Sequence, residues 1–212
     1  MADHSMTRSA DQGIHVPTRR RLAVLLSGRG SNFEAIADAV AAGGIPKAEI
    51  VAVISDVPGA AGLERARERG LPAHAVDRRR FASRREHEAQ ILRILETARP
   101  DVICLAGYMR VLSPEFVAKF PRRILNIHPS LLPKFPGLHA QKRALEAGET
   151  VSGCTVHFVD EGTDTGPTIL QRTVPVLPGD TEESLSERIL VEEHAAYPEA
   201  IRRVLSGAGK ER

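Results

Sequence analysis

Short apolar runs alternate with amphipathic helical patterns along most of this chain. The runs are LAVLL (22–26), EIVAVIS (49–55), DVICLAG (101–107), RILNIH (123–128), CTVHFV (154–159) and TILQRTVPV (168–176). Alternating strands and helices predict a mostly parallel sheet, and the first four runs are nearly continuous in apolar residues, as strands covered on both faces are. The last two runs have no helical pattern between them, so we expect an antiparallel part in the C-terminal half. The predicted fold class is therefore α/β, with an open, twisted, Rossmann-like sheet and helices on both faces.

Length and composition fit one domain. The chain has 212 residues and a hydrophobic content of 42%, enough for a single α/β core. We expect a disordered N-terminal arm at residues 1–20, one domain at residues 21–207 and a flexible tail at residues 208–212. No stretch approaches the roughly 20 apolar residues of a membrane span, and the arm lacks the apolar centre of a secretory signal.

Charge leaves the kind of partner open, whereas cysteine usage points to a compartment. Lys and Arg number 29 against 27 Asp and Glu, so the net charge of +2 neither demands nor excludes an anionic partner. Cys104 and Cys154 lie far apart in apolar runs, which is typical of buried free thiols. We therefore expect a protein of the cytoplasm, where thiols stay reduced, and no membrane partner.

Two helices are marked by capping patterns at their first residues. Ser83 with Glu86 predicts one helix, and Asp180 with Glu183 predicts another near the C-terminus. Apolar residues recur at helical spacing after both patterns. Glu193 falls on the apolar face of the second helix, where an acid is either a residue of the rim or a ligand to a buried cationic group.

The segment LAVLLSGRGSNFEAI (22–36) leads from a strand through a glycine-containing turn into a helix that we expect to begin near Ser31. The backbone N–H groups of Gly30, Ser31 and Asn32 would lie at the helix start, where free donors and the helix dipole favour an anion such as a phosphate. The pattern is neither G-x-G-x-x-G nor the Walker loop, so a dinucleotide or ATP is not supported. The alternative is a tight turn with Ser31 as the N-cap.

Asn126 and His128 alternate with Ile127 at the end of a predicted strand, so their side chains point to the same side. Open α/β sheets bind their ligands at this carboxyl edge. An Asn amide can donate hydrogen bonds to an oxyanion, and a His can donate a proton or stabilise negative charge, so the pair suits a tetrahedral intermediate. The alternative is a histidine that has only a structural role at the edge of the core.

Asp164 is the carboxylate that we expect to pair with His128. It lies in DEGTDTGPTIL (160–170), where two glycines and the Asp and Thr residues predict a loop before a strand. Such a pair would raise the pKa of His128 and relay protons, whereas the alternative role is to cap a turn. No serine or cysteine lies in a nucleophile motif, so covalent catalysis is disfavoured, and the histidine spacings match no zinc site, so we expect no metal.

Five segments together resemble the phosphoribosylglycinamide formyltransferases, the folate-dependent enzymes of purine synthesis. They are LSGRGSNFEAI, LAGYMRVLSPEFV, ILNIHPSLLPKFPGLHA, GCTVHFVDEGTDTGPTILQ and EEHAAYP, and they occur in order between about Leu22 and about Leu205. NIHPSLLP alone is also similar to a segment of methionyl-tRNA formyltransferases and formyltetrahydrofolate hydrolases. SGRGSN favours the first family, and we expect neither the tRNA domain nor the regulatory domain of those relatives.

The resemblance implies transfer of the formyl group of 10-formyltetrahydrofolate to the amine of glycinamide ribonucleotide, with no metal. By position it implies that Asn126, His128 and Asp164 are catalytic. The implied ribonucleotide contacts are Gly30, Ser31 and Asn32 at the phosphate, then Gly107, Pro129 and Glu193, with Leu190 replacing a polar residue of some relatives. The implied folate contacts are Met109, Arg110, Val111, Leu112, Asn126, Asp160, Glu161, Gly162, Thr163 and Asp164, with Arg84 and Arg110 near the anionic tail. It also suggests a cis peptide at Leu132-Pro133.

Two other functions stay open on the sequence. One is a tRNA formyltransferase, for which the basic cluster DRRRFASRREH (77–87) could serve as an RNA contact. The other is a ligand-binding module without turnover. We favour small-molecule substrates and no nucleic acid, because the basic cluster has no interleaved aromatic pattern and borders an amphipathic helix. We expect a monomer or homodimer.

Overall fold

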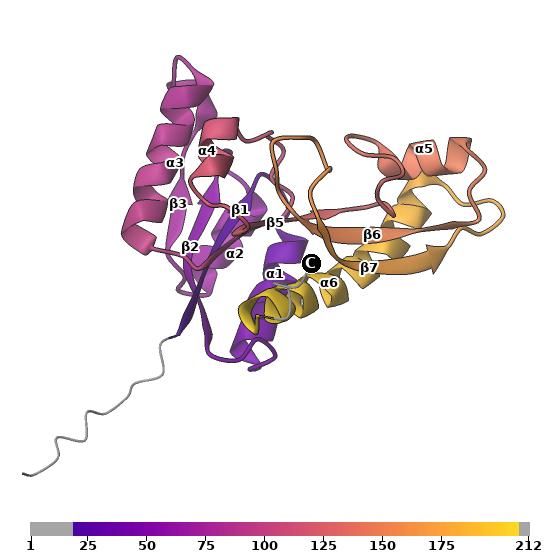
Figure 1. The fold of residues 1–212 in the computed structure, drawn as a ribbon, viewed down its shortest axis with the longest axis horizontal. Helices are drawn as coiled ribbons and strands as arrows, with labels where there is room; N and C mark the ends of the chain where they lie inside the picture. The colour runs from indigo at the N-terminus through magenta and orange to yellow at the C-terminus, as the bar shows by residue number, and fades with distance from the viewer. Residues whose placement is uncertain (1–18, 208–212) are drawn as a thin grey trace, which may run out of the picture.

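The computed structural model describes residues 19–207 (Figure 1). Within them, the strands are β1 (Arg20–Leu26), β2 (Ala48–Ser55), β3 (Ala73–Ala75), β4 (Val102–Leu105), β5 (Ile124–His128), β6 (Val151–Phe158) and β7 (Thr168–Pro175). The helices are α1 (Ser31–Ala41), α2 (Ala61–Glu68), α3 (Arg84–Ala98), α4 (Pro114–Ala118), α5 (Ala140–Glu146) and α6 (Glu182–Leu205), with a 3₁₀ turn η1 (Arg78–Arg80). The expected arm and tail lie outside the described residues, except for residues 19 and 20, and Arg20 already belongs to β1.

In the described chain the strands form one seven-stranded sheet in the order β3-β2-β1-β4-β5-β6-β7. The first five are parallel, whereas β6 runs antiparallel to β5 and β7 runs antiparallel to β6. This confirms the predicted mixed sheet. The sequence did not predict β3, because three residues are too few to show a period.

Helices cover both faces of the sheet, as predicted. One core cluster joins the sheet to α1, α2 and α6, and a second joins its other face to α3 and α4. Figure 1 shows α3 and α4 on one side of the strands and α1 and α6 on the other. Cys104 and Cys154 are buried free thiols, and burial raises the pKa of Cys154 to about 12.

The two capping predictions had different outcomes. The Ser83 side chain accepts a hydrogen bond from the Glu86 amide at the start of α3, as expected. Helix α6 instead begins one residue later than the Asp180 pattern indicated, with Thr181 as its N-cap and Ser184 completing the capping box. Asp180 is unavailable as a cap because Arg188 binds both oxygens of its carboxylate.

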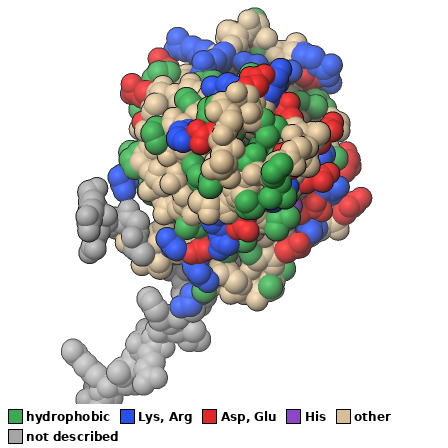
Figure 2. All heavy atoms as spheres, turned by 90° about the vertical axis from the view of Figure 1, so that its right-hand side faces the viewer, with side chains coloured by type: hydrophobic (Ala, Val, Ile, Leu, Met, Phe, Trp, Pro, Cys, Tyr) green, Lys and Arg blue, Asp and Glu red, His purple; other side chains and the backbone are tan. Residues whose placement is uncertain are grey.

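Helix α6 is the longest helix in the described chain and crosses the C-terminal half of the sheet. Tyr197 anchors it, because its buried hydroxyl lies 3.0 Å from the carbonyl oxygens of both Leu105 and Leu125. Within the described residues, no helix combines the length and the apolar character needed to cross a bilayer. The end of the molecule near α5 shows hydrophobic side chains at its centre with both signs of charge around them (Figure 2).

Candidate active site

The loop after β1 approaches the start of α2 very closely. Gly30 is the N-cap of α1 in the left-handed conformation, with φ of 79°, and no side chain caps this helix. A Cβ on Gly30 would lie 2.5 Å from the Cα of Gly62, so only glycine fits. Ser31 is the first helical residue, and its alternative role as an N-cap is therefore wrong. The first N–H groups of a helix have no acceptor within it, and the first two helical residues, Ser31 and Asn32, line the space beside the loop.

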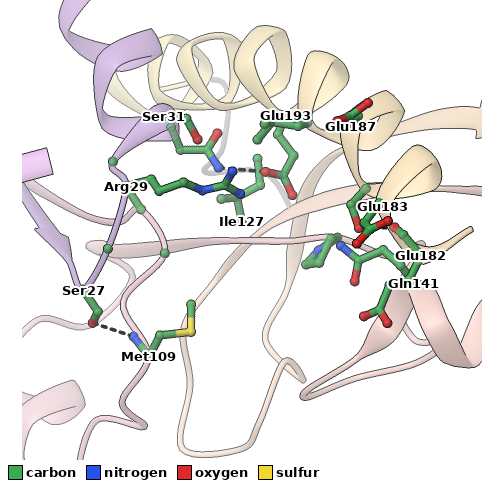
Figure 3. Close-up of a pocket in the computed structure, with 18 residues that line it drawn as sticks. Ser27, Arg29, Ser31, Met109, Ile127, Gln141, Glu182, Glu183, Glu187 and Glu193 are labelled. Atoms are coloured by element: carbon green, nitrogen blue, oxygen red, sulfur yellow. Dashed lines mark hydrogen bonds between the residues drawn. The ribbon is translucent and has the colours of Figure 1, made fainter. Parts of the chain in front are cut away.

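A cavity of about 700 Å³ opens beside this loop. The predicted ribonucleotide contacts all line it: Gly30, Ser31, Asn32, Gly107, Pro129, Leu190 and Glu193. Figure 3 shows the Arg29 side chain reaching into the cavity from the loop, with glutamates of α6 along the opposite wall. Arg29 is the only Lys or Arg among the described lining residues, against four carboxylates, which are Glu182, Glu183, Glu187 and Glu193. No sequence motif predicted a role for the Arg29 side chain.

Glu193 lies in the floor of this cavity and is only 7% exposed. Its carboxylate accepts a hydrogen bond of 2.7 Å from the Asn32 side-chain amide (Figure 3). Burial raises the pKa of Glu193, and the Asn32 hydrogen bond opposes that effect. The Asn32 side-chain oxygen is buried and has no partner within the described chain. Two acceptors therefore face a site that suits a donor or cationic group, and the alternative of a rim position for Glu193 is wrong.

A second cavity, of about 320 Å³, adjoins the first. Five residues line both cavities: Gly107, Met109, Ile127, Pro129 and Gln141. The predicted residues that line the second are Met109, Arg110, Val111, Leu112, Asn126, His128, Asp160, Gly162, Thr163 and Asp164. Glu161 and Arg84 line neither cavity; Arg84 is held by Glu88 at 2.9 Å.

The three predicted catalytic side chains meet in the second cavity. Asp164, in the left-handed conformation with φ of 56°, places one carboxylate oxygen 3.3 Å from Nδ1 of His128 and 2.8 Å from the Gly137 amide. The other oxygen accepts a hydrogen bond of 3.3 Å from the Asn126 side chain. An amide, an imidazole and a carboxylate therefore surround one side of this cavity.

His157 is a fourth member of this cluster. It lies on β6 directly opposite Asn126, with Nε2 at 3.2 Å from the Asn126 amide nitrogen and 3.5 Å from Asp164. Nδ1 donates to the Phe158 carbonyl oxygen at 2.8 Å, which leaves Nε2 facing both the Asn126 amide and the Asp164 carboxylate. The sequence did not predict a place for His157 in this site. The pairing register of β5 and β6 was the missing information.

The protonation states differ from the sequence expectation. His128 donates from Nε2 to the Phe135 carbonyl oxygen at 2.8 Å. Burial lowers the pKa of His128, which outweighs the opposing effects of Phe135 and Asp164, so the expected increase is wrong. Burial also acts to raise the pKa of Asp164, but hydrogen bonds from His157 and Gly137 outweigh it and lower this pKa to about 2. At neutral pH the site therefore combines an ionised carboxylate with a neutral imidazole. No group of three or more metal-binding side chains occurs in the described chain.

Comparison with known proteins identifies the family. The family model described as formyl transferase matches residues 20–201. The chain belongs to the formyl transferase family. This confirms the family resemblance seen in the sequence motifs.

Individual relatives of this formyl transferase agree. It is 47% identical to the phosphoribosylglycinamide formyltransferase of Escherichia coli (strain K12), over 84% of this chain and 83% of that protein. It is 56% identical to the trifunctional purine biosynthetic protein adenosine-3 of Drosophila pseudoobscura pseudoobscura over 90% of this chain, which spans only 14% of that protein. The crystal structure of glycinamide ribonucleotide transformylase 1 from Symbiobacterium toebii is 52% identical, with a TM-score of 0.87 and 89% of each chain covered.

The lowered pKa of Asp164 predicts a pH-dependent contribution to stability. An unfolded aspartate titrates near pH 3.9, about two units above the folded value, so the folded state gains about 3 kcal/mol at neutral pH, and most of this is lost as the pH falls from about 5 to 2. We expect the difference in unfolding free energy between the wild type and Asp164→Asn to shrink by that amount over this range. Urea unfolding at a series of pH values measures it, and a difference that does not change with pH would contradict the assignment.

Proposed function

We propose that this chain transfers the formyl group of 10-formyltetrahydrofolate to the amine of 5′-phosphoribosylglycinamide, a step of purine biosynthesis. The observation that carries the proposal is that two cavities adjoin beside Asn126, His128 and Asp164. A transfer between two bound molecules needs such a junction. The proposed substrates are small molecules, and we place the reaction in the cytoplasm, in keeping with the two free thiols. The active form is a monomer or homodimer.

The first cavity is the proposed ribonucleotide site. The phosphate binds at the amides of Gly30, Ser31 and Asn32, where a helix N-terminus favours an anion. The glycinamide end lies toward Gly107 and Pro129, and its amine, which is cationic before transfer, is attracted to Glu193. Leu190 lines the same cavity and can offer the ribose only an apolar contact.

The second cavity is the proposed folate site. The pterin lies against residues 109–112 and the loop at residues 160–164, where Met109 and Val111 are exposed apolar side chains that a flat heterocycle would cover. Arg110 lies in the same cavity lining and faces the anionic tail of the folate. Arg84 can join it through the guanidinium nitrogens that Glu88 does not bind.

The chemistry follows from the cluster around Asp164. The substrate amine first releases to solvent water the proton that makes it cationic, and the neutral amine then attacks the formyl carbon. The new carbon–nitrogen bond forms and the carbonyl electrons move onto oxygen. The Asn126 side-chain N–H, which donates to Asp164 in the free protein, and the His128 Nε2–H, which donates to Phe135, donate to this oxyanion instead. The proton lost by the amine after attack passes through the His128 and Asp164 pair. The intermediate collapses as the bond to N10 of the folate breaks and N10 takes up a proton, which leaves formylated ribonucleotide and tetrahydrofolate.

Charge pairing disfavours a tRNA substrate. Arginines of the basic cluster (77–87) pair with acidic side chains of the same chain: Arg78 with Asp56, Arg79 with Asp77 and Arg84 with Glu88. Their charge is thus partly neutralised before any RNA could bind. A module without turnover is disfavoured because the four polar side chains of the Asp164 cluster are held in mutual contact.

An assay with 10-formyltetrahydrofolate and either acceptor separates the three functions. We expect formylation of 5′-phosphoribosylglycinamide and none of methionyl-tRNA. Formylation of the tRNA would instead show a tRNA formyltransferase. Binding of both small molecules without product would show a ligand-binding module without turnover. Isothermal titration with a non-reactive folate analogue provides the binding measurement.

Replacing the proposed oxyanion donors should abolish most turnover. We expect Asn126→Ala and His128→Ala each to lower kcat by about 100-fold or more, because each removes a preorganised donor at the developing charge. His74→Ala is the matched control, because His74 lies on β3 and lines neither cavity. Circular dichroism confirms folding, and full activity of either site variant would reject the oxyanion role.

The Arg29 side chain should recognise the phosphate. Because it is the only lining cation of the first cavity in the described chain, we expect Arg29→Met to raise KM for the ribonucleotide by roughly 10- to 100-fold, as for loss of a charged hydrogen bond. The dephosphorylated acceptor should react equally well with the variant and the wild type. Arg93→Met, on the exposed face of α3, is the control. Equal losses of activity with the phosphorylated and the dephosphorylated acceptor would show that Arg29 does not bind the phosphate.

A further inference from the structure

One short segment forms part of the wall between the two cavities, together with Ile127, Pro129 and Gln141, which also line both. Gly107 and Met109, which follow β4, line both of them, and Ala106 lines the first. Groups bound on either side would therefore touch the same backbone. A shift of this segment would change the distance between the two reacting molecules.

Ser27 holds the segment at two points. Its backbone amide donates to the Gly107 carbonyl oxygen at 3.0 Å, and its hydroxyl oxygen accepts from the Met109 amide at 2.9 Å (Figure 3). Met109 itself is 67% exposed, so its side chain contributes little packing that would fix the segment. The Ser27 hydroxyl is therefore the main attachment of the Met109 backbone.

Asp56 fixes the direction of that hydroxyl. The Ser27 hydroxyl donates its single proton to Asp56 at 2.6 Å, which leaves its lone pairs for the Met109 amide. Asp56 is only 1% exposed, and its other oxygen accepts from Arg78 at 3.2 Å. The carboxylate is thus an acceptor that water does not compete for.

Strand order explains why these residues meet. Asp56 follows β2, Ser27 follows β1, and the wall follows β4, and these strands are neighbours in the order β2-β1-β4. The chain leaves β1 toward β2 and leaves β4 toward β5, so these two connections run in opposite directions from neighbouring strands. Open α/β sheets form their ligand crevice at this position. The chain of hydrogen bonds therefore crosses that crevice along the carboxyl ends of three strands.

We propose that Ser27 and Asp56 are positioning residues of the transfer reaction, which hold the wall at residues 106–109 so that the two substrates meet at reacting distance. This inference rests on the proposed function. Asp56 lines neither cavity and acts through Ser27. Ser27 lines the first cavity, but its hydroxyl proton and its acceptor site are engaged by Asp56 and Met109.

The attachment can be tested without any substrate. Hydrogen exchange, followed by NMR on the free protein, should show at least about tenfold faster exchange of the Met109 amide in Ser27→Ala, because the acceptor that protects it is gone. Ser55→Ala is the matched control, since it removes a buried hydroxyl next to Asp56 whose hydrogen bonds within residues 19–207 are to Val57 alone. Unchanged exchange at Met109 in Ser27→Ala, or equal acceleration in Ser55→Ala, would overturn the attachment.

Kinetics test whether the attachment matters for transfer. We expect Ser27→Ala and Asp56→Ala each to lower kcat by about 10- to 100-fold, since small displacements of reacting groups have effects of this order. Asp56→Asn should retain kcat within a few fold, because its amide oxygen can still accept from Ser27. The double variant Ser27→Ala/Asp56→Ala should be no slower than Ser27→Ala alone, because Asp56 acts through the hydroxyl.

The outcomes separate a positioning role from a structural one. Loss of folded protein alone would lower the measured rate in proportion to the unfolded fraction. The same loss would then appear in Ser55→Ala if it unfolds to the same extent. Additive losses in the double variant, or wild-type kcat in Ser27→Ala, would overturn the proposal. If the wild type formylates neither acceptor, the proposed function fails, while the exchange measurement still decides whether Ser27 holds the wall.

Discussion

The largely buried carboxylate of Asp164 holds the candidate active site together. An ionised carboxylate is costly to bury unless donors surround it, and here they come from three separate segments: the Gly137 amide before α5, Asn126 on β5 and His157 on β6. His128 lies against the same carboxylate. The free-energy cost of leaving this charge without donors therefore favours structures in which the loop before α5, strand β6 and strand β5 lie close together. The second cavity takes its shape from that convergence.

Much of the fold was predictable because its signals are local. Continuous apolar runs identified the longer strands, and the capping pattern at Ser83 located the start of α3. The failures occurred where a local signal competes with a tertiary contact. Asp180 is as good an N-cap in sequence as Thr181, but Arg188, two turns along α6, binds its carboxylate, and the helix begins one residue later. Strand β3 forms because its backbone can pair with the edge of β2, and its three residues carry no strand pattern of their own.

The convergence of Asn126, His128 and Asp164 was predictable, whereas the electrostatics of the candidate site were less so. Asn126, His128 and Asp164 could be named because polar side chains at a strand end and in a glycine loop stand out from their neighbours. The role of His157 depends on the register of β5 and β6, which no single-strand pattern contains. The Asn32 contact of Glu193 joins residues 161 positions apart. The direction of the His128 pKa depends on how deeply the ring is buried, and the sequence showed only its partner.

The lowered pKa of His128 suits the proton balance of the proposed transfer better than the expected increase would. The attacking amine must lose a proton and N10 of the leaving folate must gain one, so the relay has to accept before it donates. An imidazole already protonated at neutral pH could not accept, whereas burial keeps His128 neutral. Once it accepts the proton, the adjacent Asp164 carboxylate stabilises the new imidazolium, since that carboxylate stays ionised over the whole physiological range. Burial lowers the pKa of His128 and the Asp164 charge raises it, so the ring can take up a proton and release it again within a single turnover.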